Sequence, residues 1–191
     1  MADGRVLRGA RNREAIIEAL LALYRAGELR PTALQVAEQA GVAPRSVFHH
    51  FADMEELVAE LSARQFREHG HLMDAPDPQG SLAERIDALV AQRGALFEAV
   101  APVRRAALLE APRSPTVRRN LAGLARRLRA QLERTFASEL RSAGDLDALD
   151  LLTSWEAWDR LRTNQRLSAT RARRVLATTA FAVLRDAEEA R

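Results

Sequence analysis

The fold is decided by residues 32–57, which read TALQVAEQAGVAPRSVFHHFADMEEL. Thr32 is a residue type that caps helix N-termini through its hydroxyl, and Gln35, three positions later, completes a capping box. Gly41 then supplies the left-handed backbone conformation that commonly ends a helix. The pattern predicts a short helix over 33–40.

A second short helix follows almost at once. Pro44 suits the first position of a helix, because the amide hydrogen that it lacks would have no partner there. The spacing predicts a helix over 44–51 that turns Val47 and Phe51 inward. Two short helices joined by a tight turn at Gly41 have the spacing of a helix-turn-helix, which places its second helix in the major groove of DNA.

The outer face of this second helix carries the side chains expected to contact DNA. Arg45 should read a base, because its planar fork can donate two hydrogen bonds to guanine. Ser46 and His49 would add a base or phosphate contact, and Thr32 would offer its hydroxyl and free amides to a phosphate. The predicted DNA-binding residues are Thr32, Pro44, Arg45, Ser46, Phe48, His49 and His50, of which His50 fits packing inside the domain equally well.

The segment before this motif divides into an arm and a helix. Gly4 and Gly9 disfavour helix near the N-terminus, so we expect a flexible basic arm that follows the DNA backbone or enters the minor groove. A helix is predicted over 12–26, with Gly27 ending it. The arginines assigned to the arm are Arg5, Arg8, Arg11 and Arg13.

Composition sets the class of protein. The 191 residues are 47% hydrophobic and 29% charged, and strong helix formers dominate, which favours an all-α fold. The net charge is only +3 and every basic residue is arginine, so DNA binding has to be argued from the motif. The sequence has no cysteine, no long apolar run and no signal-peptide pattern at its start, which predicts a cytoplasmic protein without disulfides or thiolate metal sites.

The rest of the chain is predicted to be helical. Asp53 with Glu56 repeats the capping signature and opens a helix over 54–71, and the breaker-rich segment 74–80 follows. We expect an all-α fold of about nine helices, with a DNA-binding helix-turn-helix domain over 1–53 and an effector-binding and dimerisation domain over 54–191. Further helices are predicted over 81–100, 102–111, 116–142, 146–165 and 169–190.

The motif resembles the TetR family of transcriptional regulators. The residues that carry the resemblance are Thr32, Val36-Ala37, Ala40-Gly41-Val42, the run from Arg45 to Phe51, and the run from Asp53 to Leu57. The resemblance implies a homodimer that binds a near-palindromic operator in double-stranded DNA and represses until a small-molecule effector binds. Three positions depart from the family's usual residues, since Ala43, Phe48 and Met54 stand where Ser, Tyr and Lys are common, which predicts fewer phosphate contacts.

Two tryptophans mark the candidate effector pocket. Trp155 and Trp158 lie on one helical face, where they fit ordinary core or dimer packing as well as a pocket lining. Arg93 and Glu110 are candidate polar partners of an effector. The predicted effector-binding residues are Phe66, Leu89, Arg93, Leu96, Phe97, Leu108, Leu124, Trp155 and Trp158.

The last two helices are expected to form the dimer interface. Ala157, Ala172, Ala177 and Ala180 would allow close approach, and apolar area would come from Leu149, Leu152, Val175, Leu176, Val183 and Leu184.

Other functions fit the sequence less well. It shows no pair of nucleophile and base, no phosphate loop and no zinc-like spacing, so we predict neither an enzyme nor a cofactor. The alternative from another class is a helical small-molecule binding or protein-interaction module that has lost its DNA affinity.

Overall fold

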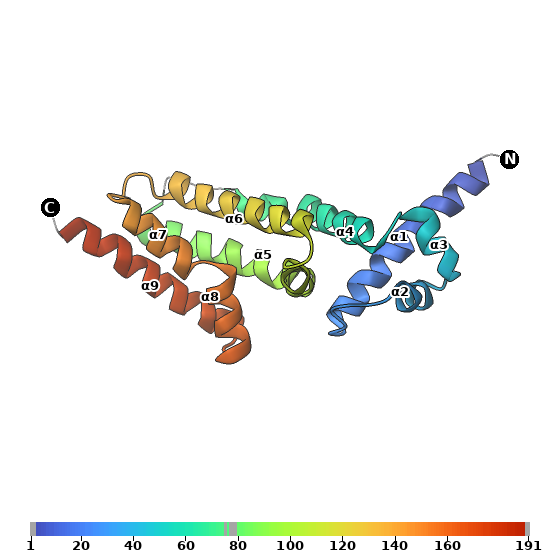
Figure 1. Ribbon diagram of the computed structural model, residues 1–191. Coiled ribbons are helices and arrows are strands. Elements are labelled where there is room, and N and C mark those ends of the chain that lie inside the picture. Colours follow the sequence, from blue (N-terminus) through green and yellow to red (C-terminus); the bar gives the residue numbers. More distant parts are fainter. Residues whose placement is uncertain (1–2, 75, 77–79, 190–191) are drawn as a thin grey trace. The chain divides into compact units, whose positions relative to one another are not determined.

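The computed structural model describes residues 3–74, 76 and 80–189, and the regular structure in that part of the chain is entirely helical (Figure 1). The all-α prediction is therefore confirmed. A 3₁₀ turn over Gly70–Met73 follows α4, and a π-helical turn over Arg160–Asn164 follows α8. The α-helices are α1 (Asp3–Arg25), α2 (Ala33–Ala40), α3 (Pro44–His50), α4 (Met54–His69), α5 (Leu82–Glu110), α6 (Pro115–Thr135), α7 (Ala143–Leu152), α8 (Trp155–Asp159) and α9 (Ala169–Glu189).

The chain divides into two compact units. The head unit comprises the chain up to Glu68 together with Val100–Arg119, and the body unit comprises His69–Ala99 and the chain from Asn120 onward. Both α5 and α6 contribute residues to each unit. Part of the breaker-rich segment 74–80, namely 75 and 77–79, lies outside the described residues.

The head unit is built on an apolar core beneath α1. Apolar side chains recur on one face of α1 at helical spacing, and α2, α3, α4 and the end of α5 pack on that face. Burying this face accounts for most of the stability expected of such short helices. The fully buried core residues include Ile16, Ile17, Leu20, Val36, Ala37, Val47, Phe51, Leu57 and Leu61, joined by Val103 and Ala106 of α5.

The predicted flexible arm is wrong, because α1 already begins at Asp3. Each residue added to an existing helix gains a hydrogen bond at little cost, and the helix formers around Gly9 outweigh that glycine. Arg13 instead belongs to the packed part of the head. It pairs with Glu60 at 3.0 Å, and its guanidinium carbon lies 4.9 Å from the centroid of the Phe51 ring.

One helix, α5, replaces the two that were predicted over 81–100 and 102–111, with Pro102 inside it. An interior proline removes one helical hydrogen bond and typically costs about 3 kcal/mol. Here the helix continues because both of its halves are buried: Phe97 is fully buried in the body unit, while Val103 and Ala106 are buried in the head core. Packing on either side of Pro102 outweighs the local penalty.

Two predicted helices end early or break. In each case an arginine of α5 donates a hydrogen bond to a carbonyl at the end of the helix. α6 ends at Thr135 rather than near Ser142, and Nη1 of Arg85 donates to the Thr135 carbonyl at 2.8 Å. The helix predicted over 146–165 breaks after α7, where Nη1 of Arg93 donates to the Thr153 carbonyl at 2.9 Å. Because a guanidinium already donates to each of these carbonyls, neither needs an amide donor from a further turn of helix.

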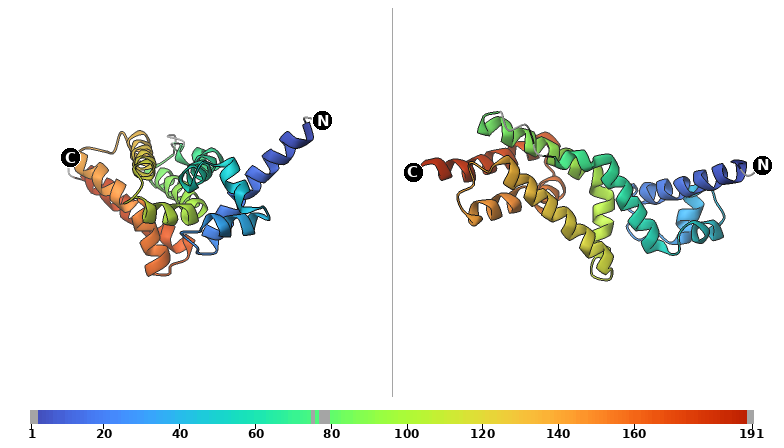
Figure 2. Two further views of the ribbon diagram at one scale, coloured as in Figure 1. Left: turned by 45° about the vertical axis from the view of Figure 1, so that its right-hand side comes forward. Right: turned by 90° about the horizontal axis from the view of Figure 1, so that it is seen from above.

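Aromatic side chains and α9 complete the body unit. The Phe97 ring meets Trp155 edge-on with centroids 5.8 Å apart and lies 6.4 Å from Trp158. The helix α9 packs against α7, as two views of the body show (Figure 1, Figure 2). Its buried row has a spacing of four residues and consists of Ala172, Leu176, Ala180 and Leu184. Ala190, the predicted last residue of this helix, lies outside the described residues.

Candidate DNA-binding surface

The turn between α2 and α3 is set by local sequence. The Thr32 hydroxyl accepts the Gln35 amide hydrogen at 3.3 Å, while the Gln35 side-chain oxygen accepts the Thr32 amide hydrogen at 2.8 Å. This confirms the predicted capping box. Gly41 ends α2 with φ 66°, a left-handed conformation that non-glycine residues adopt at a cost. The two helices are therefore joined by a short, defined turn, as in a helix-turn-helix.

Helix α3 begins without a side-chain cap. Ala43 makes no capping hydrogen bond, so the fixed φ of Pro44 sets the start of the helix. Val47 and Phe51 are each 1% exposed, which confirms that they face inward. The amide of Phe51 donates to the Val47 carbonyl at 2.9 Å and closes the helix. Packing of these two side chains fixes which face of α3 points outward.

That outward face carries most of the predicted DNA-binding residues. Arg45 and His49 are exposed, and Phe48 keeps 57% of its surface exposed despite its apolar ring. Ser46 and His50 are half-buried at the edges of this face. Within the described part of the chain, the Arg45 guanidinium makes no hydrogen bond or ion pair, so its donors are available to a ligand.

The two histidines of α3 differ in environment. Their rings meet edge-on with centroids 5.2 Å apart. Burial lowers the pKa of His50, and the neighbouring His49 and Arg13 lower it further. His50 is therefore neutral at neutral pH and would contact DNA as a hydrogen-bonding group rather than as a cation.

Two residues have positioning roles that bear on this surface. The Thr32 hydroxyl is already engaged in the capping box, since it donates to the Gln35 side-chain oxygen at 2.9 Å. Arg13 braces α3 through its contact with the Phe51 ring, a role that the sequence analysis missed. No local pattern could have revealed it, because the two residues are far apart in the sequence.

The residues predicted to bind an effector fall into both units. Leu89, Arg93, Leu96, Phe97, Trp155 and Trp158 are buried in the body unit, and Leu124 is half-buried there. Phe66 and Leu108 belong to the head unit, where they are 43% and 40% exposed. Six of these side chains are thus buried in the body unit, where Phe97 contacts both tryptophans, whereas Phe66 and Leu108 belong to the other unit.

Arg93 is the polar centre of the body cluster. It is 1% exposed, and its guanidinium donates to the Gln131 side chain at 3.3 Å, to both oxygens of Thr153, and to the Leu128 carbonyl. Burial lowers the pKa of Arg93 to about 10, and the charge of Asp150 opposes that shift. Its donors are thus used to join α5, α6 and the end of α7.

Two absences among the described residues bear on other functions. No group of three or more His, Asp or Glu side chains there is arranged to hold a metal ion. None of the described helices has the length and apolar composition that crossing a membrane requires.

Comparison with known proteins agrees with the helix-turn-helix geometry. Residues 12–61 match the profile of the family described as bacterial regulatory proteins, tetR family. No curated protein matches the chain. Solved structures do match it along most of its length.

Three of these structures are transcriptional regulators. One, from Rhodococcus sp. Rha1, is 17% identical with a TM-score of 0.72, covering 93% of this chain and 96% of its own. A putative TetR-family regulator from Mesorhizobium loti is 20% identical with a TM-score of 0.67, covering 93% and 96%. A tetR-family regulator from Streptomyces coelicolor is 16% identical with a TM-score of 0.74, covering 94% and 83%.

The head unit is thus a helix-turn-helix domain of the DNA-binding class. More particularly, residues 12–61 match the N-terminal domain of the tetR family of bacterial regulatory proteins, and over 93–94% of its length the chain has the fold of the TetR-like regulators compared above.

Proposed function

We propose that this protein is a homodimeric repressor that binds a near-palindromic operator through α3 and is released by a small-molecule effector. The observation that carries the proposal is the outward face of α3. Arg45 lies exposed there, without a hydrogen-bond or ion-pair partner among the described residues, on a helix whose register is fixed by the buried Val47 and Phe51. Such a face has the donors and the shape that major-groove reading requires.

Each predicted contact has a physical role. Arg45 would pair with the O6 and N7 atoms of a guanine, and His49 with Ser46 would add a base or phosphate bond. The exposed ring of Phe48 suits apolar contact with a thymine methyl or a sugar. Pro44 and Thr32 would approach phosphates at the starts of α3 and α2, and His50 would stand at the edge of the contact.

Dimerisation is proposed through the last two helices predicted from the sequence, which correspond to α7 with α8 and to α9, with a corrected set of side chains. Leu149, Leu176 and Leu184 are buried within one chain, as are Ala172 and Ala180, so they cannot form the surface between copies. The interface would instead use apolar side chains that the single chain leaves open. These are Leu151, Val175 and Phe181, which are 70%, 36% and 36% exposed, beside the half-buried Leu152, Ala177 and Val183.

The remaining assignments rest on the family resemblance and the body's buried cluster. We assign DNA binding to residues 1–53 and effector binding with dimerisation to 54–191, place the protein in the cytoplasm with its DNA, and assign it no catalytic activity. An effector would act by binding more tightly to a conformer whose two heads are wrongly spaced for the operator.

The test is selection of binding sites from random double-stranded DNA by the purified protein, alongside the Arg45→Ala variant. We expect a near-palindromic consensus with half-sites one or more helical turns apart. Loss of a bidentate contact typically costs about 1–3 kcal/mol of discrimination, so the variant should bind the consensus roughly 5- to 150-fold more weakly and accept other bases at one position per half-site.

The matched control is Arg126→Ala, which removes an exposed arginine from α6 without touching α3. It should leave both affinity and consensus unchanged. If the parent protein enriches no sequence even at low salt, the regulator proposal fails, and a binding module without DNA affinity becomes the better explanation.

A further inference from the structure

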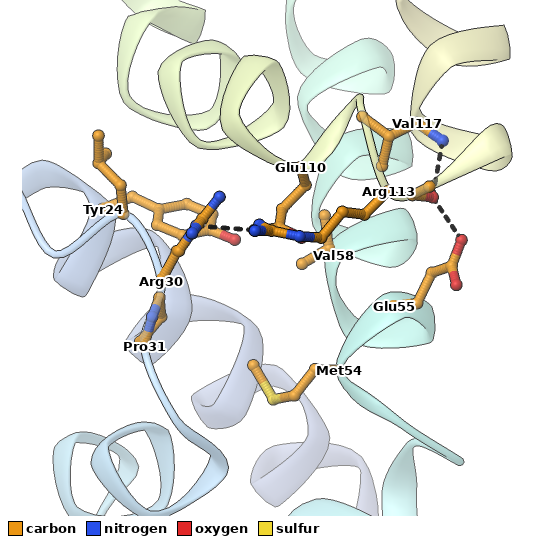
Figure 3. Close-up of a pocket in the computed structure, with 11 residues that line it drawn as sticks. Tyr24, Arg30, Pro31, Met54, Glu55, Val58, Glu110, Arg113 and Val117 are labelled. Atoms are coloured by element: carbon orange, nitrogen blue, oxygen red, sulfur yellow. Dashed lines mark hydrogen bonds and ion pairs between the residues drawn. The ribbon is translucent and has the colours of Figure 1, made fainter.

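A groove of about 380 Å³ opens on the head unit beside the helix-turn-helix (Figure 3). One wall comes from the end of α1 and the loop after it, including Tyr24 and Arg30. A second comes from the first turns of α4, including Met54 and Val58, and a third from the turn between α5 and α6, including Arg113. The volume falls within the range of about 300–1,000 Å³ that is typical of small-molecule sites.

The two carboxylates of the groove already have partners. Glu110 forms an ion pair with Nε of Arg30 at 3.0 Å, and Glu55 accepts a hydrogen bond from the Ser114 hydroxyl at 2.6 Å (Figure 3). These contacts join the walls to one another. They also give each of the two carboxylates a hydrogen-bond donor within the head unit.

Two hydrogen-bond donors of the groove remain without a partner. Tyr24 is only 5% exposed, yet its hydroxyl makes no hydrogen bond within the described part of the chain. Figure 3 shows this hydroxyl pointing into the groove. The Arg113 guanidinium likewise has no hydrogen bond or ion pair among the described residues and extends across the opening.

The chemistry of these donors selects an anion. Burial, followed by the charge of Glu110, raises the pKa of Tyr24 to about 12, so the phenol is a neutral O–H donor at neutral pH. Arg113 adds a positive charge and forms no ion pair with either acid of the groove. A guanidinium and a phenol together suit a carboxylate, and the apolar walls suit a compact hydrocarbon group.

We propose that this groove binds a small organic carboxylate, with its charged end between the Tyr24 hydroxyl and the Arg113 guanidinium and its apolar end against Met54 and Val58. None of these residues belongs to the effector cluster of the body unit. The groove is therefore a second ligand site of the protein.

The position of the groove gives a bound carboxylate a way to act on DNA binding, and this part of the inference rests on the proposed function. The chain leaves the groove at Pro31, forms α2 and α3, and returns to it at Met54. A ligand there contacts both ends of the helix-turn-helix. If it prefers one placement of α3, it must change the affinity for DNA, and DNA must change the affinity for the ligand by the same factor.

Tyr24 makes a direct test possible, because it is the only tyrosine in the sequence. With ¹³C-labelled tyrosine, each NMR ring signal of the full chain reports on this groove alone. We expect phenylacetate or hexanoate to shift the Tyr24 signals in a saturable way. The uncharged phenylacetamide should bind roughly tenfold more weakly, because its carbonyl can accept a hydrogen bond from Arg113 but forms no ion pair with it. The cationic phenethylamine should bind as weakly or not at all, because its ammonium group accepts no hydrogen bond and is repelled by Arg113.

Calorimetric titration of variants assigns the contacts. Arg113→Gln should weaken phenylacetate binding roughly tenfold, and Tyr24→Phe should weaken it severalfold by removing the hydroxyl alone. Arg119→Gln, an exposed arginine of α6 that does not line the groove, is the matched control and should bind as the parent does. Arg113 is exposed, so its variant should fold normally.

Two outcomes would overturn the proposal: neither carboxylate shifts the Tyr24 signals at millimolar concentration, or phenethylamine binds more tightly than phenylacetate. DNA binding without ligand is measured separately. A protein that selects an operator yet takes up no carboxylate disproves the site alone, and one that binds carboxylate yet selects no DNA disproves only the proposed function.

Discussion

The head and the body end their helices by different means. In the head, α2 starts and stops on residues within or next to it, since Thr32 caps one end and Gly41 the other. In the body, α6 stops at Thr135 and α7 stops before Thr153, and in both cases a guanidinium of α5 holds the carbonyl at the end. Helix ends in the head are therefore local properties, whereas these two ends in the body depend on a distant segment.

This difference has a simple physical basis. A hydroxyl or a glycine satisfies a helix end within four residues, so it acts before tertiary structure forms. Arg85 and Arg93, about two turns apart on α5, can reach the ends of α6 and α7 only after those helices have packed. The ends of α6 and α7 should thus be lost together with the packing of α5, while the head should tolerate loss of one cap.

The sequence supplies a separate probe for each unit. Tyr24 is the only tyrosine and lies in the head, while both tryptophans, Trp155 and Trp158, lie in the body. Tryptophan fluorescence therefore follows the body, and the NMR signals of labelled tyrosine follow the head. A change in stability can therefore be assigned to one unit.

The largest decrease in the free energy of unfolding is expected for Arg93→Met. The change removes a buried guanidinium and leaves the Thr153 and Leu128 carbonyls without the donors they now have. Buried polar groups that lose their partner cost about 1–3 kcal/mol each, so the free energy of unfolding should fall by about 3 kcal/mol. Urea unfolding followed by tryptophan fluorescence measures this loss.

The control for that variant is Arg174→Met, at an exposed position of α9. It should change the free energy of unfolding by less than about 0.5 kcal/mol. If Arg93→Met were equally mild, the idea that α5 sets the end of α7 would be wrong.

A smaller decrease in the free energy of unfolding is expected for Gly94→Ala, at the neighbouring position on α5. A Cβ atom there would lie 2.9 Å from Cη2 of Trp158, whose indole nitrogen donates to Glu98 at 3.0 Å. Overpacking of this kind typically costs about 1–3 kcal/mol, and we expect a loss of about 2 kcal/mol by tryptophan fluorescence. A stabilising effect, as alanine usually gives inside a helix, would mean that the Trp158 ring can move aside.

In the head, Gly41→Ala should cost only about 1 kcal/mol, because its Cβ would meet no atom within 4 Å and the penalty comes from φ 66° alone. Labelled-tyrosine NMR during urea unfolding measures it. Gly123→Ala, inside α6 and without a positive φ, is the matched comparison and should stabilise the body by up to about 1 kcal/mol. Equal effects at the two glycines would rule out a left-handed turn at Gly41.

The ionisation of Tyr24 should affect the stability of the head only at high pH. The pKa of Tyr24 is raised from 10.0 to about 12, so the folded head favours the neutral phenol. Its contribution to stability is complete below pH 10 and is lost as the pH rises through about 12. Phenolate absorbance should appear near pH 10 in the urea-unfolded protein and only near pH 12 in the folded one. Coincident titrations would show that Tyr24 is not buried.

The head could be predicted from sequence in most details, and the body only in part. The residues Thr32, Gly41 and Pro44 place α2 and α3 correctly because each acts on its own neighbourhood. Ser168 likewise places the start of α9, where its hydroxyl accepts the Arg171 amide hydrogen at 3.2 Å. By contrast, Pro102 suggested a helix boundary that burial on both sides of it overrides.

The candidate sites follow the same division. The outward face of α3 was predictable, because a helix of known register needs only its buried positions to define the exposed ones. The groove was not, since Tyr24, Met54 and Arg113 come from three separate segments. No periodicity or motif links those positions.

By itself, then, the sequence determined the all-helical class, the helix-turn-helix and the residues that α3 presents, because caps, turn residues and helical spacing act over a few positions. Tertiary structure alone decided the unbroken α5, the ends of α6 and α7, and the groove beside α2. Those features depend on burial and on hydrogen bonds between distant residues, which exist only once the chain has folded.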